Sequence, residues 1–178
     1  MGGWVGGGVG WWEVRMRGAD RLIEQQYAML LRRDVARLPE LYAVDGSYGM
    51  PGVTVRPTEL PALLRTWTGA FPDLRVDPLG AVRTAGGAAV EHRLTGTHTG
   101  VLHTPFGTVA PTGQSVSWQV VDMVRVRRGR IVTWRCYFDW GQLITSLGVQ
   151  VAGLSRQVPL ASVSTGEPGF AGREPAAA

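Results

Sequence analysis

Hydrophobic residues recur at helical spacing in the first half of the chain and alternate with polar residues in much of the second half. The helical period predicts helices over 19–33 and 58–71, with a short helix beginning at Asp34 between them, and we expect Asp20 to cap the first one. A last helix is predicted over 139–147, with Gly148 as its C-cap. The predicted strands are 45–50 (strand or loop), 74–82, 88–98, 115–127 and 131–139. Helices followed by a run of long strands favour an α+β domain, in which helices pack on one face of a curved sheet and leave a cavity.

One carboxylate interrupts an apolar strand face. Side chains alternate along 115–127, and one face consists of Val116, Trp118, Val120, Asp122, Val124 and Val126. Burying an ionised carboxylate without partners is costly, so Asp122 is expected to be hydrogen-bonded or partly protonated. A lone acid in an apolar wall is typical of a small acid/base site or of a polar anchor for an apolar ligand. In the alternative interpretation, a neighbouring Arg or a backbone N–H satisfies Asp122, which then only helps to fix the fold.

The next strand repeats this arrangement after the turn Arg127-Arg128-Gly129. One face of 131–139 carries Val132, Trp134, Cys136 and Phe138. A three-residue hairpin loop would place Asp122 opposite Trp134 and Val120 opposite Cys136, whereas a two-residue loop would place Asp122 opposite Arg135. The apolar match favours the first register.

The length of 178 residues predicts one domain, which we place at 19–150. A Gly- and Trp-rich segment, 1–18, is predicted to be a flexible extension, and 151–178 a disordered tail. The net charge is +4, every basic residue is Arg, and no basic run is interleaved with aromatics, so no nucleic-acid partner is expected. No apolar stretch is long enough for a membrane span. The single cysteine, Cys136, fits a reducing, cytoplasmic location.

Four short motifs stand in a characteristic order along the chain. They are Ala70-Phe-Pro-Asp-Leu74, Gly96-Thr-His-Thr-Gly100, Pro111-Thr-Gly113 and Gly129-Arg-Ile-Val, the last followed by Tyr137-Phe-Asp139 and Leu147-Gly148. Over roughly 19–148 the chain resembles the SnoaL-like polyketide cyclases of the NTF2-like superfamily. The resemblance implies a cone of curved antiparallel sheet with about three helices closing a ligand cavity. It also implies a hydrophobic small-molecule substrate from natural-product biosynthesis and a homodimer formed through the sheet.

The resemblance places unusual residues at the family's catalytic positions. In its aldol cyclases, the strand after the Gly-Arg-Ile turn carries a His and, two residues on, the catalytic Asp; here these positions hold Trp134 and Cys136. A pocket His of the preceding strand falls at Asp122. Limonene-type epoxide hydrolases carry Trp-Arg-Asp-Tyr-Phe-Asp at the end of the sheet, where this chain has Trp134-Arg-Cys-Tyr-Phe-Asp139. By this resemblance, the usual acid/base Asp is absent and a different pocket acid, Asp122, is present.

Two ring-closing chemistries remain open from the sequence. An aldol closure needs a base and a donor for the developing enolate. Asp122 is the candidate base, and His92 is the candidate donor or orienting residue. A pericyclic closure needs chiefly a shaped apolar pocket. Its predicted wall consists of Trp134, Cys136, Trp118, Trp67, Val120, Phe138 and Met50. The alternatives are an epoxide hydrolase or isomerase on the same fold and a non-catalytic binding or dimerisation module.

Other candidate chemistry is weaker. The three histidines, His92, His98 and His103, have spacings unlike known zinc sites, so we expect neither a metal nor another cofactor. Asp139 is interpreted as a helix cap or as a partner of Arg135.

Overall fold

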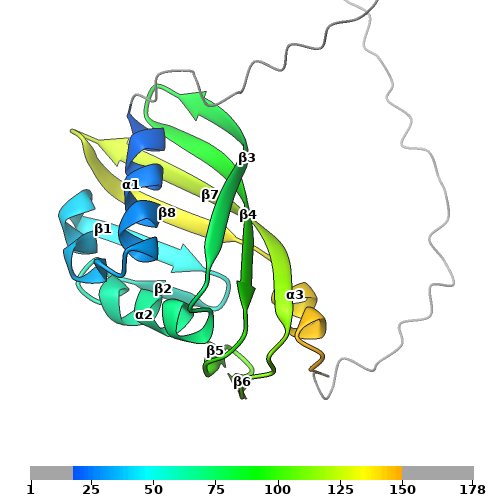
Figure 1. Ribbon diagram of the computed structural model, residues 1–178. Helices are drawn as coiled ribbons and strands as arrows, with labels where there is room; N and C mark the ends of the chain where they lie inside the picture. Colours follow the sequence, from blue (N-terminus) through cyan, green and yellow to red (C-terminus); the bar gives the residue numbers. More distant parts are fainter. Residues whose placement is uncertain (1–17, 150–178) are drawn as a thin grey trace, which may run out of the picture.

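The computed structural model describes residues 18–149, and a six-stranded curved sheet with four helices forms their framework (Figure 1). The predicted extension 1–18, apart from Gly18, and the predicted tail 151–178 lie outside the described residues. The helices are α1 (Ala19–Leu31), η1 (Val35–Leu41, a 3₁₀ helix), α2 (Leu60–Ala70) and α3 (Trp140–Ser146). The strands are β1 (Tyr42–Met50), β2 (Val53–Val55), β3 (Arg75–Thr84), β4 (Gly87–Thr97), β5 (Leu102–Thr104), β6 (Gly107–Val109), β7 (Ser115–Arg127) and β8 (Arg130–Tyr137).

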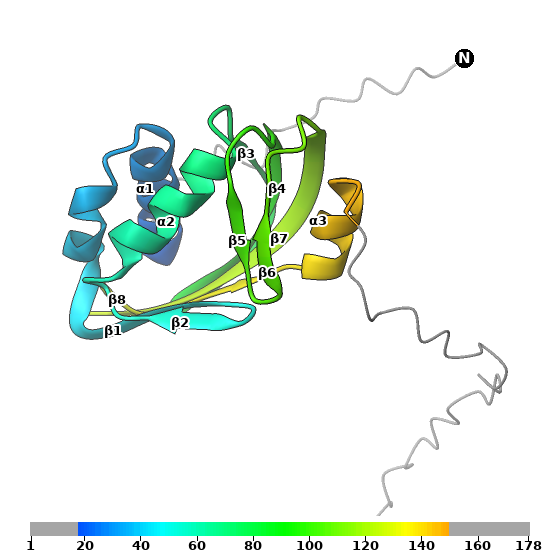
Figure 2. The ribbon, with the colours of Figure 1, turned by 90° about the horizontal axis from the view of Figure 1, so that it is seen from below.

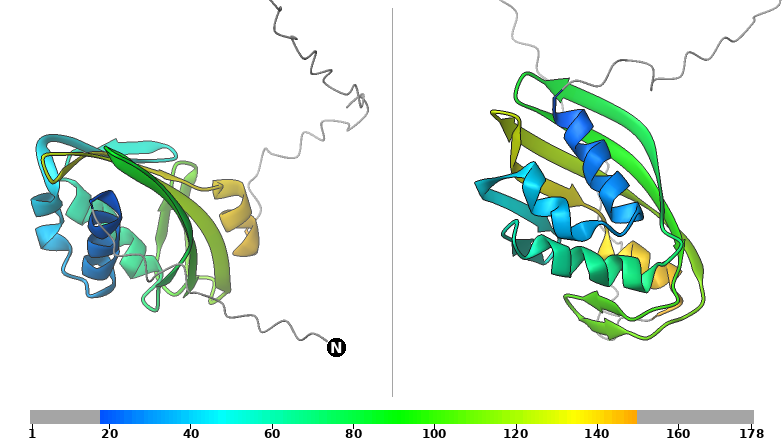
Figure 3. Two further views of the ribbon diagram at one scale, coloured as in Figure 1. Left: turned by 90° about the horizontal axis from the view of Figure 1, so that it is seen from above. Right: turned by 60° about the vertical axis from the view of Figure 1, so that its left-hand side comes forward.

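The large sheet has the order β2-β1-β8-β7-β4-β3 and curves around α1 and α2, which cover its concave face (Figure 3). The predicted α+β class is therefore confirmed. The sheet is mixed rather than wholly antiparallel, because β1 pairs with β8 in parallel. The short strands β5 and β6 form a separate hairpin beside α2 (Figure 2) that the sequence pattern did not indicate.

The first helix follows its hydrophobic pattern but not the predicted cap. Ile23 and Leu30 are buried, and the buried Tyr42 hydroxyl of β1 donates to Gln26 Oε1 at 2.7 Å. The expected capping role of Asp20 is wrong, since Gly18 is the N-cap residue and no side chain caps the helix. Asp20 lies inside the first turn and pairs instead with Arg83 of β3.

The β7–β8 hairpin corrects the predicted register. Arg127 pairs with Arg130 across a two-residue turn in which Arg128 and Gly129 have φ of 51° and 74°, the positive values that a type I′ turn requires. An irregularity follows, because Arg125 pairs with Thr133 and Val126 with Ile131, leaving Val132 as an extra residue. From Trp134 onward, the even-numbered residues of β8 share the concave face with those of β7, as expected. Before the bulge, however, the buried residue opposite Val126 is the odd-numbered Ile131, and Asp122 lies opposite Cys136 and not Trp134.

The end of the sheet is closed by aromatic side chains and by α3. Asp139 caps α3 as predicted, with Oδ1 accepting from the backbone N–H of Gly141 at 2.7 Å. Gly148 follows the helix with a φ of 75°, which suits its predicted place at the C-terminal end. Between residues 18 and 149, no helix is long and apolar enough to cross a membrane.

Candidate functional site

The Asp122 carboxylate is fully buried, with 0% of its surface exposed, and polar side chains from two elements satisfy it. The Tyr27 hydroxyl of α1 donates to Oδ2 at 2.6 Å, and the Trp134 indole N–H of β8 donates to Oδ1 at 2.7 Å. Neither the predicted arginine nor a backbone N–H provides these bonds. Charge-assisted hydrogen bonds are roughly twice as strong as neutral ones, so the two donors offset much of the cost of burial.

His92 completes this cluster from β4. Its Nδ1 lies 3.1 Å from Asp122 Oδ2, and its ring centre lies 4.7 Å from that of Tyr27. Within the described residues, Nδ1 has no aligned hydrogen-bond partner, so the approach to Asp122 is a close contact rather than an aligned hydrogen bond. Catalytic hydrogen bonds are often poorly aligned before a substrate is bound and tighten afterwards.

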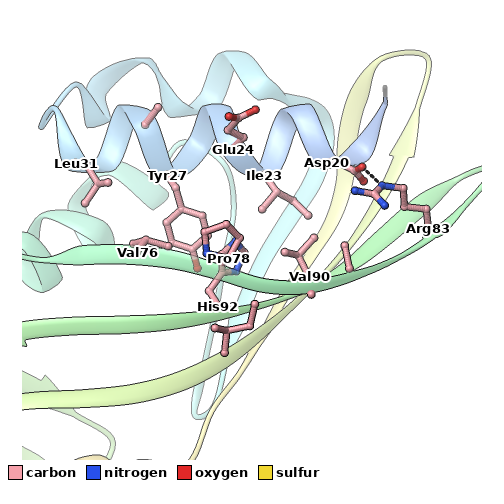
Figure 4. A pocket seen from close by; sticks show the side chains of 14 residues that line it. Asp20, Ile23, Glu24, Tyr27, Leu31, Val76, Pro78, Arg83, Val90 and His92 are labelled. Carbon is pink, nitrogen blue, oxygen red and sulfur yellow. Dashed lines mark hydrogen bonds and ion pairs between the residues drawn. The ribbon is translucent and has the colours of Figure 1, made fainter. Parts of the chain in front are cut away.

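A cavity lies between α1 and the strands β3 and β4, and we call it the outer pocket (Figure 4). Its volume is about 600 Å³, within the usual range for small-molecule sites. Apolar side chains form most of its wall, and His92 and Tyr27 contribute the polar groups nearest Asp122. The apolar side chains are Ile23, Ala28, Leu31, Val76, Pro78, Leu79, Ala81 and Val90, while Asp20, Glu24 and Arg83 add charge.

A second cavity, the inner cavity, lies deeper under the curved sheet. Its volume is only about 40 Å³, room for a few water molecules. Six of the seven residues predicted as the substrate wall line it, namely Met50, Trp67, Trp118, Val120, Cys136 and Phe138. The seventh, Trp134, is 1% exposed and lines neither cavity. The predicted wall is thus largely packed side chains, and the open space lies beside it.

Tyr27 lines both cavities, and Asp122 lines neither. The structure therefore brings the two predicted catalytic residues together, but only His92 faces open space. The carboxylate lies behind His92 and Tyr27 as seen from the outer pocket. Its direct contact with a substrate in either cavity would require those side chains to move.

Burial and the nearby carboxylate keep the surrounding acids protonated. Desolvation, followed by the Asp122 charge, raises the pKa of Tyr27 and that of Cys136 well above their ordinary values. Desolvation also raises the pKa of Tyr48, which lies beside them. Cys136 is therefore a thiol rather than a thiolate at neutral pH, which argues against a nucleophilic role.

Tyr27 and Arg83 are site residues that the sequence analysis missed. Tyr27 lies four residues after Ile23, on the same side of the helix as a buried residue, and this spacing was the available signal. For Arg83 the sequence offered no such signal, because the direction of its side chain depends on an irregularity in β3 that the residue pattern does not show.

A comparison with models of known protein families identifies the family of this chain. The model of the SnoaL-like polyketide cyclases matches residues 21–147, so the chain belongs to that family.

Solved structures agree with this assignment. AclR from Streptomyces galilaeus, a proposed hydroxylase, is 25% identical with a TM-score of 0.61, and the match covers 72% of this chain and 94% of AclR. IdmH from Streptomyces antibioticus, a proposed polyketide cyclase, is also 25% identical with a TM-score of 0.61, covering 73% and 98%. An LEH-like epoxide hydrolase from M. tuberculosis shares the fold at 20% identity and a TM-score of 0.53, covering 71% and 86%. A search of the curated proteins gave no match.

Proposed function

We propose that this protein is a cofactor-independent cyclase that closes a ring in an apolar polyketide-type intermediate of natural-product biosynthesis, with His92 as its general base. The observation that carries the proposal is the position of His92, on the wall of a mostly apolar pocket of about 600 Å³ with Asp122 3.1 Å behind it. A base in a dry, shaped pocket is what proton abstraction from a carbon acid needs.

The geometry supports an exchange of the roles expected from the sequence. Asp122 is completely buried and already accepts two hydrogen bonds, so it is poorly placed to remove a proton from a substrate. A carboxylate behind an imidazole favours the tautomer with the proton on Nδ1 and stabilises the imidazolium once it forms. Nε2 of His92 is then the nitrogen that accepts the substrate proton, and Asp122 is a positioning residue.

This arrangement favours an aldol-type closure over a pericyclic one. His92 would take a proton from a carbon activated by neighbouring carbonyl groups, and the resulting enolate would attack a second carbonyl carbon within the same molecule to form the ring bond. The alkoxide formed would take the proton back from His92, so the step is an isomerisation without a co-reactant. A pericyclic closure would need the pocket shape but no base.

The test compares His92→Asn with the wild type on polycyclic β-keto esters that can close a further ring. We expect kcat to fall by about 10²- to 10⁴-fold, the usual contribution of general base catalysis, without loss of folding. His103→Asn, at an exposed position on β5, is the matched control and should keep full activity. Unchanged turnover in His92→Asn would exclude His92 as the base and favour the pericyclic alternative.

An isomerase that moves a proton without closing a ring is the second candidate, because the same pair of residues would perform it. Mass-neutral products are expected from both reactions, so the number of rings must be read from the NMR spectrum of the product. Hydrolysis of an epoxide would instead incorporate oxygen from labelled water.

The outer face of the sheet supports a second proposal, that two copies of the chain pair through it. Val121 and Met123 of β7 and Tyr137 of β8 are 38%, 51% and 52% exposed there, and Val121 lies opposite Tyr137 in the register. Exposed apolar patches on a sheet mark interaction surfaces. Met123→Glu should therefore convert a dimer into a monomer in size-exclusion chromatography with light scattering. A wild-type chain that is already monomeric at high concentration would contradict the proposal.

A further inference from the structure

Arg83 enters the outer pocket because of a β-bulge. In β3, Pro78 pairs with His92 but Gly80 pairs with Glu91, so Leu79 is an extra residue. Before the bulge, the even-numbered Val76 and Pro78 line the pocket; after it, the odd-numbered Ala81 and Arg83 do. In a regular strand Arg83 would point to the outer face, and bulges of this kind often redirect a side chain beside a functional site.

Asp20 holds this guanidinium at one end of the pocket (Figure 4). Arg83 Nε donates to Asp20 Oδ2, and the Asp20 side chain is only 4% exposed. The two terminal nitrogens of Arg83 make no hydrogen bond to the described residues, and 40% of the side chain is exposed. Arg83 is thus fixed through one nitrogen while its other donors stay available, at the end of a cavity whose walls are mainly apolar.

We infer that Arg83 is a substrate anchor, and that it binds a neutral carbonyl oxygen, such as that of an ester or ketone, at the end of the substrate remote from the reacting carbon. Asp20 neutralises the guanidinium, and Glu24 adds a further carboxylate to the pocket wall, so a substrate carboxylate is disfavoured relative to an uncharged acceptor. This inference rests on the proposed function, because that function identifies which end of the substrate reacts.

The sheet sets the distance between the anchor and the base. Arg83 pairs with Ala88, which precedes His92 by four residues on β4. At about 3.3 Å per residue, the backbone positions of the two side chains are about 13 Å apart along the strand. We therefore expect an elongated apolar substrate, with a carbonyl oxygen at one end and the carbon acid near the other.

The experiment measures binding of three rigid probes by anthracene fluorescence anisotropy: methyl anthracene-2-carboxylate, 2-isopropylanthracene and anthracene-2-carboxylate. The wild type should bind the ester about tenfold or more tightly than the apolar isostere, as expected for a hydrogen bond from a charged donor, and more tightly than the acid. Arg83→Met should remove the preference for the ester and leave the affinity for 2-isopropylanthracene within about twofold.

Two further variants keep the test decisive. Asp20→Asn with Arg83→Met avoids leaving a buried carboxylate unpaired, and should bind the probes as Arg83→Met does. Arg93→Met makes the same change at an exposed arginine of β4 outside both cavities and should retain the preference for the ester.

The possible failures are distinguishable. An Arg83→Met protein that still prefers the ester would overturn the anchor, and tighter binding of the acid than of the ester would overturn the assignment of a neutral oxygen. Because the probes do not react, either result leaves the His92 proposal standing. Conversely, a His92→Asn protein with full turnover would show that His92 is not the general base, while the binding measurements on Arg83 would still stand.

Discussion

The outer pocket and the inner cavity share a wall at Tyr27, yet one is open and the other is almost full. Aromatic rings from α2, from β7 and from the segment after β8 fill the inner region: Trp67 of α2 lies 6.2 Å from Trp118 of β7 and 5.7 Å from Phe138, measured between ring centres. Among residues 18–149, no comparable cluster fills the space between α1 and the bulged strand β3, where the cavity is about 600 Å³ against about 40 Å³ inside. From this difference we expect the inner region to contribute more to the stability of the domain and, under the proposed function, the outer pocket to bind the ligand.

The largest effect that tests this division is expected from Trp118→Ala. The Trp118 side chain is 2% exposed, and its removal should lower the free energy of unfolding by about 3–5 kcal/mol, measured by urea denaturation. Leu31→Ala is the matched truncation in the outer pocket. Leu31 is 43% exposed, so its loss should cost less than about 1 kcal/mol while weakening the binding of the anthracene probes. Equal losses of stability in the two variants would contradict the different roles expected for the two regions.

A smaller effect is expected at the shared wall. Tyr27→Phe removes the hydroxyl that donates to Asp122 and should destabilise the fold by about 1–3 kcal/mol, because a buried carboxylate loses a partner. Tyr27→Ala would also join the two cavities and should admit larger polycyclic probes than the wild type. If Tyr27→Ala bound only the same probes as Tyr27→Phe, the ring would not be the partition that the structure suggests.

The smallest effect concerns pH and the packed end of the inner region. His98 is completely buried, its ring centre lies 5.4 Å from that of Phe71, and desolvation lowers its pKa below 6.5. A depressed pKa means that the unfolded chain takes up a proton before the folded one, so His98 contributes stability above about pH 6.5 that is lost as the pH falls through the folded-state value.

His98→Gln should therefore flatten the fall in melting temperature between pH 7 and pH 5. His103→Gln, at an exposed position, should leave the slope unchanged. An identical slope in the wild type and in His98→Gln would show that other groups cause the pH dependence.

Much of the fold was predictable because each element carries a strong local pattern. The alternation along 115–127 gave the buried face of β7, and the spacing of apolar residues gave α1 and α2. The β7–β8 register was not predictable in the same way. Beyond the bulge, a two-residue turn followed by the extra residue Val132 puts the even-numbered residues of β8 on the same face as a three-residue loop would. The pattern of buried faces alone therefore cannot distinguish the two registers.

The candidate site was predictable only in part, for a related reason. Periodicity identified Asp122 and His92 as polar residues on apolar faces, and the structure brings them within 3.1 Å of each other. It could not show that Tyr27 and Trp134 bond to the carboxylate or that aromatic rings fill the predicted wall, because both depend on how distant elements pack. The catalytic and substrate-binding roles of all these residues stay predictions until variants are tested.

Asp20 and Tyr27 lie seven residues apart on α1, about two helical turns or 10.5 Å. One residue fixes Arg83 at one end of the outer pocket, and the other bonds to the carboxylate behind His92. A small displacement of this single helix would loosen both contacts at once. Under the proposed function, entry of a substrate beneath α1 and alignment of His92 would therefore be mechanically linked. We expect a ligand that holds the helix against the sheet to order both contacts together.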